Sequence, residues 1–527
     1  MRGLAEVWRT VLEMDEIDED SNFFELGGHS MLAAMLITQC ERVVGTIIPL
    51  QLIFENPVFA DFVDAVLHYD GMGGPAFPKI VPQGLSQAPL SLQQQDYLAF
   101  ERKLRLPWVN NMVAVVEVGA PVALDTLRSA LNSLVRKHPA LRTAVRRHEG
   151  EDTQVLVPLD EVPAVPCAEI DLSELPPERR PAALRNRVRR EHLVPFDLDS
   201  GIMVRCEIFR NGQDPDVLVL HLHHAACDGN CVGLIFDDLA VACAGRELPA
   251  AGPDAPGHLD YCQWQHENYD EMMGGSREHW RALVRELAAD IAESDAPGPP
   301  PGASYARFSA HVPEADTHQL RTWVASDGLT EFSAVAAATA LAVGRVLGRT
   351  KAGIGMLLDT RASTGLEHTV GSYAVSSLMS VDLGRVGTPR AFIARVQEGH
   401  LEARRWTQLP LDTLLAEPAD ELGADPSALV DVVVDFERIY QMNRPGRLPL
   451  SVGLDLNELL RMPLLGPRRA LSAFVQEDGR LTLAIECIDD PAERAQAQEL
   501  LAAAIDSLAF FATKPDTDIE PASLGAR

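Results

Sequence analysis

Hydrophobic positions near the N-terminus repeat with the period of an α-helix. Residues 4–12 predict an opening helix, and a second stripe predicts a last helix of the first 70 residues. Asn56 is a favoured N-cap and Pro57 is favoured at the first helical position, so we expect this last helix to begin at Pro57. Its apolar positions fall at i, i+3, i+4 and i+7: Phe59, Phe62, Val63 and Val66.

The longer part of the chain, residues 90–513, mixes helical and strand periods. Residues 113–118 and 217–222 are apolar or β-branched runs of strand length. A helical stripe lies between them: Leu127, Ala130, Leu131, Leu134 and Val135. We therefore expect an α plus β fold. If the second strand persists to its end, its period of two sends His223 and His224 to opposite faces, so one can be buried while the other meets a cavity.

Proline- and glycine-rich stretches divide the chain. Residues 71–89 read as a linker, residues 295–302 interrupt the longer part, and residues 514–527 lack apolar periodicity, which predicts a disordered tail or the start of another linker. The predicted organisation is multidomain: a small all-α helical bundle (1–70), a linker (71–89), two lobes (90–267 and 268–513) and a tail (514–527).

Composition narrows the classes of function. The 527 residues carry a formal net charge of −30, which argues against nucleic acid or an anionic membrane as a partner. No signal-peptide pattern and no run of ~18 apolar residues is evident, so we expect a cytoplasmic chain. The eight cysteines form no Cys-x-x-Cys pair. His258, Cys262 and His266 have helical spacing but no apparent fourth ligand, so no metal site is expected.

Residues 26–32 read Leu-Gly-Gly-His-Ser-Met-Leu, which places Ser30 between a glycine turn and an apolar helix. A phosphate ester on Ser30 would meet the free N–H groups and positive dipole end of that helix; a plain N-cap is the alternative. The motif, with the acidic loop at 18–22, resembles the peptidyl and acyl carrier-protein family. That resemblance implies a covalent 4'-phosphopantetheine on Ser30, installed by a phosphopantetheinyl transferase.

The strand at 217–222 leads into His223-His224-Ala-Ala-Cys-Asp228-Gly229. Histidines can orient or deprotonate a nucleophile, a carboxylate can fix the scaffold, and glycine lets the backbone approach a substrate. The alternative is a pair of histidines at a strand end whose hydrogen bonds are satisfied within the fold, followed by an Asp-Gly turn. The segment resembles the His-His-x-x-x-Asp-Gly motif of condensation domains in nonribosomal peptide synthetases. Further segments are similar in the family's order: 91–95, 136–143, 260–264 and 408–412.

Three departures from that family stand in the sequence. His258 occupies the position of a usual tyrosine, and at 371–376 Val375 and Ser376 replace the usual asparagine and threonine, which predicts an altered polar lining near the substrate channel. The family's arginine-rich last motif is not recognisable at 431–440.

The resemblance implies two chloramphenicol-acetyltransferase-like lobes in a V, with a tunnel between them. A donor carrier would present an acyl or peptidyl thioester and an acceptor carrier an aminoacyl amine. His224 is the expected hydrogen-bond acceptor or general base for that amine, whereas His223 and Asp228 are expected to be structural. Arg361 is the implied partner of Asp228, and Arg142 is a second candidate.

The domain order has its own implication, because a carrier that directly precedes a condensation domain is normally its donor. The expected acceptor carrier and other synthetase modules are not in this sequence, which resembles a piece of a larger assembly line. Three other functions remain as alternatives: an epimerisation domain, a heterocyclisation domain and a non-catalytic recruitment domain. Heterocyclisation domains carry paired aspartates and recruitment domains usually a degraded histidine motif, and neither is found here.

Overall fold

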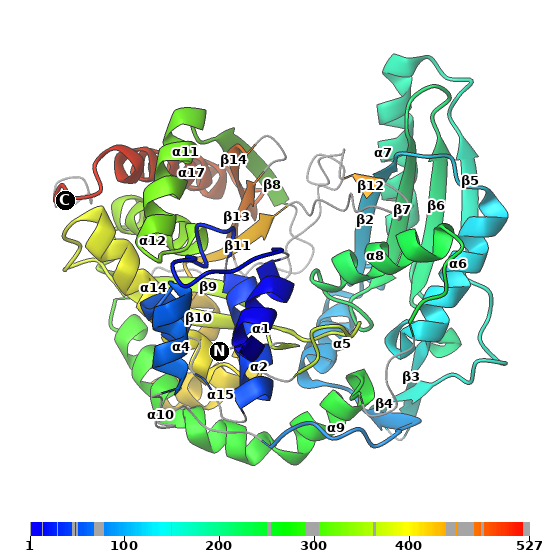
Figure 1. Ribbon diagram of the computed structural model, residues 1–527, viewed down its shortest axis with the longest axis horizontal. Helices are drawn as coiled ribbons and strands as arrows, with labels where there is room; N and C mark the ends of the chain where they lie inside the picture. Colours follow the sequence, from blue (N-terminus) through cyan, green and yellow to red (C-terminus); the bar gives the residue numbers. More distant parts are fainter. Residues whose placement is uncertain are drawn as a thin grey trace.

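Three bodies make up the protein in a computed structural model (Figure 1): a small helical bundle and two lobes, each built around a β-sheet. The structure describes residues 2–12, 14–28, 30–44, 48, 51–67, 78–148, 150–249, 255–290, 305–361, 365–438, 450–451, 468–475 and 479–519.

The helical bundle packs around Trp8, which is fully buried. Its ring lies 5.1–5.7 Å from the rings of Phe23, Phe59 and Phe62. The helices are α1 (Arg2–Leu12), α2 (Ser30–Val44), α3 (Gln51–Glu55) and α4 (Phe59–Leu67). The opening helix and the buried stripe of α4 are thus confirmed.

The predicted start of α4 at Pro57 is wrong by two residues. The Phe23 N–H donates to the Pro57 carbonyl at 2.8 Å, and Val58 forms a β-bridge with Asn22. These tertiary hydrogen bonds hold residues 57–58 in extended geometry, and the helix begins only at Phe59.

The N-terminal lobe contains a five-stranded sheet in the order β12-β2-β7-β6-β5. Helices α6 and α8 cover one face of this sheet and α7 the other. The elements are β2 (Asn111–Val118), α6 (Leu124–Lys137), β5 (Cys167–Asp171), α7 (Arg180–His192), β6 (Val204–Arg210), β7 (Asp216–His223), α8 (Cys231–Cys243) and β12 (Leu450–Ser451). Both predicted strands and the α6 stripe are confirmed. The division at 267/268 needs a correction, because β12 returns from the second half to pair with β2.

A three-stranded sheet in the order β1-β4-β3 closes the lower end of the N-terminal lobe. Strand β1 leads into helix α5, which begins with a Ser91–Gln94 capping box, and helix α9 packs beside β1. The bounds are β1 (Gln87–Pro89), α5 (Leu92–Leu104), β3 (Thr143–His148), β4 (Glu151–Leu156) and α9 (His258–Glu267).

The C-terminal lobe contains a six-stranded sheet in the order β10-β9-β11-β13-β14-β8. Helices α11, α12, α14 and α17 share one hydrophobic core with this sheet, and α10 and α15 pack together in a second cluster. The bounds are α10 (Tyr269–Ala288), β8 (Tyr305–His311), α11 (Glu314–Ser326), α12 (Glu331–Leu347), β9 (Lys351–Asp359), β10 (Ala374–Asp382), α14 (Pro389–Trp406), α15 (Leu411–Leu422), β11 (Val432–Arg438), β13 (Arg469–Val475), β14 (Leu481–Ile488) and α17 (Pro491–Thr513).

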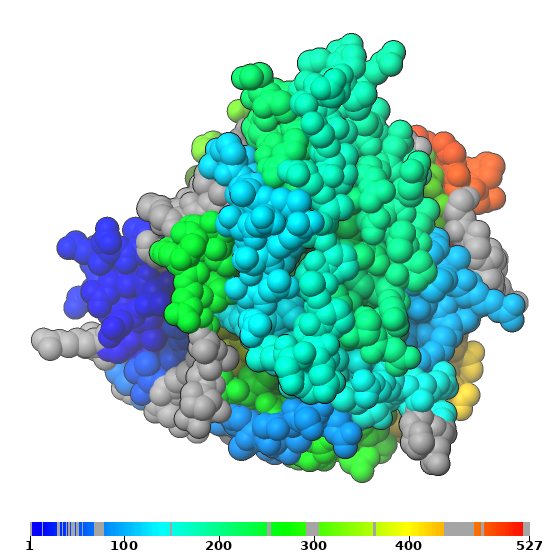
Figure 2. Space-filling model, turned by 90° about the vertical axis from the view of Figure 1, so that its right-hand side faces the viewer, coloured from blue at the N-terminus to red at the C-terminus, as the bar shows by residue number. Residues whose placement is uncertain are grey.

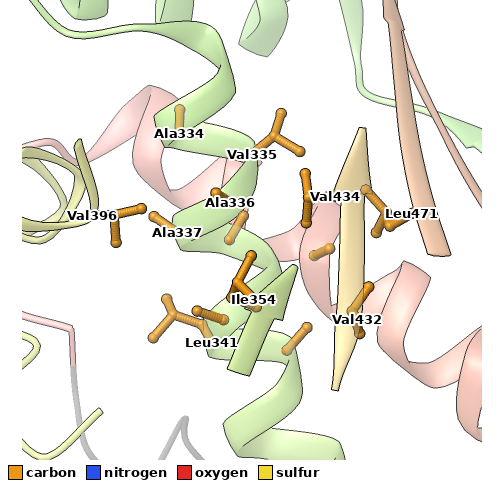
Figure 3. Packing of buried hydrophobic residues seen from close by; sticks show 14 of the residues in the cluster. Ala334, Val335, Ala336, Ala337, Leu341, Ile354, Val396, Val432, Val434 and Leu471 are labelled. Atoms are coloured by element: carbon orange, nitrogen blue, oxygen red, sulfur yellow. The ribbon is translucent and has the colours of Figure 1, made fainter. Parts of the chain in front are cut away.

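Helix α12 is the centre of the core of the C-terminal lobe. Figure 3 shows Ala336 on the side of this helix towards Val434 of β11 and Ala337 beside Val396 of α14. Residues 333–344 of this helix are all buried. Small side chains let the helix approach the sheet closely, so the packing leaves little room for larger residues.

The predicted linker is wrong for residues 78–89, which are built into the N-terminal lobe. Strand β1 pairs with β4, the Trp264 indole donates to the Pro78 carbonyl at 2.7 Å, and the Gln83 N–H donates to Asp260 at 2.9 Å. Residues 71–77 and the interruption at 295–302 lie outside the described residues.

The predicted tail is also wrong for residues 514–519. Ile519 is 7% exposed and its N–H donates to the Gly387 carbonyl at 2.9 Å, while the Arg390 N–H donates to the Pro515 carbonyl at 3.1 Å. These contacts fix the segment on the C-terminal lobe. Residues 520–527 lie outside the described residues.

The helical bundle contacts the C-terminal lobe and forms a separate body at one side of the N-terminal lobe (Figure 2). Leu401 of α14 belongs to the same buried cluster as the bundle core. A Cβ on Gly328 would lie 3.0 Å from the Phe54 carbonyl oxygen and 3.7 Å from Pro57. The contact is therefore made by the α3–α4 end of the bundle.

Within the described ranges, no single helix is long and apolar enough to cross a membrane. Helices α11 and α12 satisfy that test only as a pair, bent by 116°.

We expect Ala337→Leu to lower the free energy of unfolding by about 1–3 kcal/mol, because overpacking a dense core forces strained rotamers. Ala337 is fully buried on α12. Urea unfolding followed by circular dichroism measures the change. The matched control is Ala495→Leu on the exposed side of α17, which should leave the transition in place; equal loss in both variants would contradict the packing argument.

Candidate active site

Strand β7 brings both histidines of the motif to its end. His223 is 1% exposed, and its Nδ1 accepts a hydrogen bond from the Ala225 N–H at 3.2 Å. His224 follows the strand, is partly exposed, and donates its backbone N–H to the Asn110 carbonyl at 2.9 Å. The two side chains thus occupy different environments, but the strand period does not account for this difference, because β7 ends at His223.

Helix α5 lies against both imidazoles. The Tyr97 ring is 4.6 Å from the His224 ring, and Glu101 Oε2 lies 3.6 Å from His223 Nε2. Tyr97 and Glu101 are one helical turn apart. The Asn110 amide joins them, since it donates to the Tyr97 carbonyl at 2.8 Å and to Glu101 Oε2 at 2.9 Å.

Sequence reasoning missed Tyr97, Glu101 and Asn110. The available signal was the segment at 91–95, which caps α5 and so fixes the helix that carries Tyr97 and Glu101.

Burial sets the protonation state of His224. It lowers the pKa of the His224 imidazole to about 4, against the opposing effect of the Asp228 carboxylate. At neutral pH the ring is therefore uncharged and carries one acceptor nitrogen. His224 Nδ1 is buried and has no hydrogen-bond partner among the residues that the structure describes.

Asp228 is 1% exposed, and both of its carboxylate oxygens are hydrogen-bonded. Oδ1 accepts from Arg361 Nη2 at 2.9 Å and from the Cys231 N–H at 3.2 Å. Oδ2 accepts from the N–H groups of Tyr373 at 2.9 Å and Ala374 at 3.0 Å. Burial alone would raise the pKa of Asp228, but the Arg361 charge and these hydrogen bonds lower it below its ordinary value.

Contacts with three residues of the C-terminal lobe hold the Arg361 guanidinium in place. Nη1 donates to Asp359 at 3.0 Å, Nη2 donates to the Gly371 carbonyl at 2.9 Å, and the guanidinium carbon lies 4.4 Å from the centre of the Tyr373 ring. Arg361 Nη2 is also 2.9 Å from the Cys231 sulfur, at the start of α8. The Asp228–Arg361 ion pair therefore connects the two lobes.

Arg142, the second candidate partner of Asp228, is placed elsewhere. Its Nη1 donates to the Val157 carbonyl at 2.6 Å, beside the β3–β4 hairpin. Gly229 is exposed, and an added Cβ would meet no atom within 4 Å, so the space above it is open. Cys227 is fully buried, and burial raises the pKa of its thiol, which disfavours a thiolate nucleophile there.

The departures from the family pattern have distinct places. Val375 is 2% exposed in the core of the C-terminal lobe, so it does not line a channel, whereas Ser376 is exposed. His258 is buried, with Nε2 3.3 Å from the Ser372 carbonyl oxygen and its ring 5.1 Å from that of Tyr373. Burial lowers the pKa of His258 to about 4.

Ser30 is the first residue of α2, directly after the predicted glycine turn. Gly27 has φ +93°, and a Cβ on Gly28 would lie 2.4 Å from the Phe23 carbonyl oxygen. Both positions therefore require glycine. A phosphate ester at the start of this helix would meet N–H groups that lack helical partners, so the turn fits such a group.

Two protein families match the chain in succession. Residues 2–66 match the phosphopantetheine attachment site family, and residues 85–454 match the condensation domain family.

Among curated proteins, the chain is similar to tyrocidine synthase 3 of Brevibacillus parabrevis. The two are 25% identical over 442 residues, which cover 83% of this chain and 7% of that protein. Phosphinothricin tripeptide synthetase PhsC of Streptomyces viridochromogenes is 29% identical over 369 residues, 69% of this chain and 34% of PhsC. The chain thus spans a small part of the length of these relatives.

Two solved structures share the fold. The first condensation domain of the CDA synthetase aligns with a TM-score of 0.67 and 18% identity, over 82% of this chain and 98% of that one. The X-domain from teicoplanin biosynthesis aligns with a TM-score of 0.64 and 20% identity, over 84% and 98%.

We expect Asp228→Ala to destabilise the chain by about 3–5 kcal/mol, because it leaves the buried Arg361 charge without its partner across the lobes. Urea unfolding measures the loss. The control is Glu417→Ala, which breaks the ion pairs of the 40% exposed Glu417 with Arg277 and Arg281, 48% and 25% exposed, and should cost less than ~1 kcal/mol. Similar losses in both variants would refute the role of the buried pair.

His224 should remain neutral at pH 6. The unfolded chain binds a proton at this residue below about pH 6.5, whereas the native chain does so only near pH 4, so this residue's contribution to stability falls as pH drops through that window. Nitrogen-15 histidine NMR of the wild type and His224→Gln identifies and titrates the resonance. A titration midpoint near pH 6.5 would show that burial does not control the protonation state of the His224 imidazole.

Proposed function

This chain belongs to the condensation-domain family and carries a phosphopantetheine attachment domain in front of that domain, and we propose that it joins two carrier-bound acyl groups through a peptide bond. The amine of an acceptor aminoacyl thioester attacks the carbonyl of the donor thioester. A C–N bond forms, the donor C–S bond breaks, the donor sulfur leaves as a thiol, and the attacking amine gives up one proton.

The observation that carries this proposal is the neutral His224 imidazole, with a buried nitrogen that lacks a partner among the described residues. Such a ring can accept a hydrogen bond from the attacking amine, either to orient it or to take its proton. Tyr97 fixes the ring from one side and Asn110 fixes its backbone. Positioning of this kind accounts for a large part of catalysis when the leaving group is a good one.

His223 acts through its neighbours, as a positioning residue. Its Nδ1 accepts from the Ala225 N–H and its Nε2 faces Glu101, so the ring braces the turn that follows β7. Asp228 and Arg361 hold the same turn against the C-terminal lobe. The open space above Gly229 is the proposed approach for substrate.

The attachment domain takes a covalent 4'-phosphopantetheine, and we assign its attachment to Ser30. The group supplies a flexible thiol on which the acyl group is carried. Ser30 is the first residue of α2, and Gly27 and Gly28 form the turn before this helix. The partners that follow are a phosphopantetheinyl transferase, an acceptor carrier domain and other synthetase modules.

We place the reaction in the cytoplasm, with no membrane or nucleic acid as partner. The net charge of −30 disfavours anionic partners, and the eight cysteines are all free thiols, which a reducing compartment maintains. The preceding carrier is assigned as the donor. Epimerisation and recruitment share the same architecture, but the intact histidine pair with its ion pair favours condensation over a purely recruiting role.

Reconstitution tests this function directly. A phosphopantetheinyl transferase loads Ser30 from aminoacyl-coenzyme A, a separately loaded acceptor carrier is added, and intact-protein mass spectrometry follows the products. We expect a dipeptide on the acceptor, with His224→Ala reducing its rate by about 10²–10⁴-fold. His318→Ala, on the exposed side of α11, is the matched control, and Ser30→Ala should abolish loading.

An unchanged rate in His224→Ala would remove this residue from the reaction. Inversion of the aminoacyl group on Ser30 without transfer would instead establish epimerisation, and loading with no further product across a broad panel would favour recruitment.

A further inference from the structure

One large apolar side chain is exposed on a strand of the C-terminal lobe. Leu357 of β9 is 52% exposed, whereas its neighbours Met356 and Leu358 are 0% and 4% exposed in the core. Among the residues that the structure describes, it is the only exposed large hydrophobic side chain that lies on a β-strand. Because strand side chains alternate, Leu357 points away from the core formed with α12.

The register of β9 and β10 connects this residue to the active site. Ser376 pairs with Leu357, and Ala374 pairs with Asp359. The latter pair is attached to the ion pair, because the Ala374 N–H donates to Asp228 and Asp359 accepts from Arg361. Leu357 and Ser376 lie only two residues farther along their strands, about 7 Å away.

The same face of the sheet is covered farther from the ion pair. A Cβ on Gly355 would lie 3.0 Å from Val430, which packs against the cluster formed by α10 and α15, and Leu378, the register partner of Gly355, belongs to the same cluster. The cover therefore ends at Leu357 and Ser376. This leaves an open patch between the covered sheet and the ion pair that connects the lobes.

The segment between β9 and β10 extends from the C-terminal lobe towards α5 (Figure 1). Gln93 of α5 donates to the Ser372 carbonyl of this segment at 3.3 Å. The segment that joins these two strands thus contacts the helix that carries Tyr97, and Tyr97 contacts His224.

We propose that Leu357 and Ser376 contact the side chain of a thioester-bound aminoacyl group and select an apolar one; this rests on the function proposed above. Burial of the exposed Leu357 side chain against another apolar group is favourable, because it removes apolar surface from water. The small Ser376 leaves room for that group. The nearby Asp359 carboxylate already forms an ion pair with Arg361. It is therefore not available as a counter-ion for a cationic side chain of the substrate.

The test compares leucyl with seryl substrates, varied separately on the donor and on the acceptor carrier. We expect Leu357→Asn to lower the leucyl-to-seryl rate ratio by about 10-fold or more in one of the two arms. Ser376→Leu, which fills the space, should lower the same ratio. A ratio is unaffected by partial misfolding, because misfolding slows both substrates equally.

Leu422→Asn is the matched control, since Leu422 is 39% exposed on α15 and should leave the ratio unchanged. The arm in which the ratio moves identifies the donor or the acceptor side chain as the one selected. An unchanged ratio in both arms for both patch variants would overturn the proposal.

A binding measurement separates this inference from the function on which it rests. Isothermal titration with non-reactive leucyl- and seryl-pantetheine amides compares the wild type with Leu357→Asn. If the wild type makes no dipeptide, the proposed function fails, while a leucyl preference lost only in the patch variant still supports the patch. Equal binding of both amides by both proteins would overturn it.

Discussion

The ion pair between Asp228 and Arg361 is the interaction on which the arrangement of the two lobes depends. Removing both charges from water costs several kcal/mol per ion, and only near-complete hydrogen bonding offsets such a cost. The structure meets this demand with donors from three places: the guanidinium, the first turn of α8, and the start of β10. The same contacts that stabilise the carboxylate therefore fix a helix of one lobe against a strand of the other.

Burial favours the neutral form of both Asp228 and His224, which are only four residues apart, but their partners lead to opposite protonation states. Asp228 stays ionised because the Arg361 charge and the hydrogen bonds from Arg361 and from backbone N–H groups favour its charged form. His224 has no comparable partner, so burial favours its neutral form and lowers its pKa to about 4. The two neighbouring groups thus differ in charge at neutral pH: Asp228 is ionised and His224 is an uncharged hydrogen-bond acceptor. The proposed reaction depends on the neutral form, since a charged His224 could not accept a hydrogen bond from an amine.

The sequence permits prediction of what is local. The stripes of α4 and α6, strands β2 and β7, and the cluster of His223, His224 and Asp228 are all contained in short segments. Arg361 was reached only through a family resemblance, and Tyr97 and Glu101 were missed, because α5 meets β7 only through tertiary packing more than 100 residues away. The predicted start of α4 was wrong for the same reason, because hydrogen bonds to the loop at 22–23 outweighed the local capping preference of Asn56.

The misplaced linker boundary changes how far the helical bundle can move. The sequence predicted a linker over all of residues 71–89, but hydrogen bonds to α9 and pairing with β4 fix the chain from Pro78 onward. Between the end of α4 at Leu67 and this anchor lie ten residues, which span at most about 35 Å when fully extended. A connection of so few residues keeps the effective concentration of the bundle near its own lobes high. The anchoring of residues 78–89 therefore limits how far Leu67, where the bundle ends, can lie from Pro78.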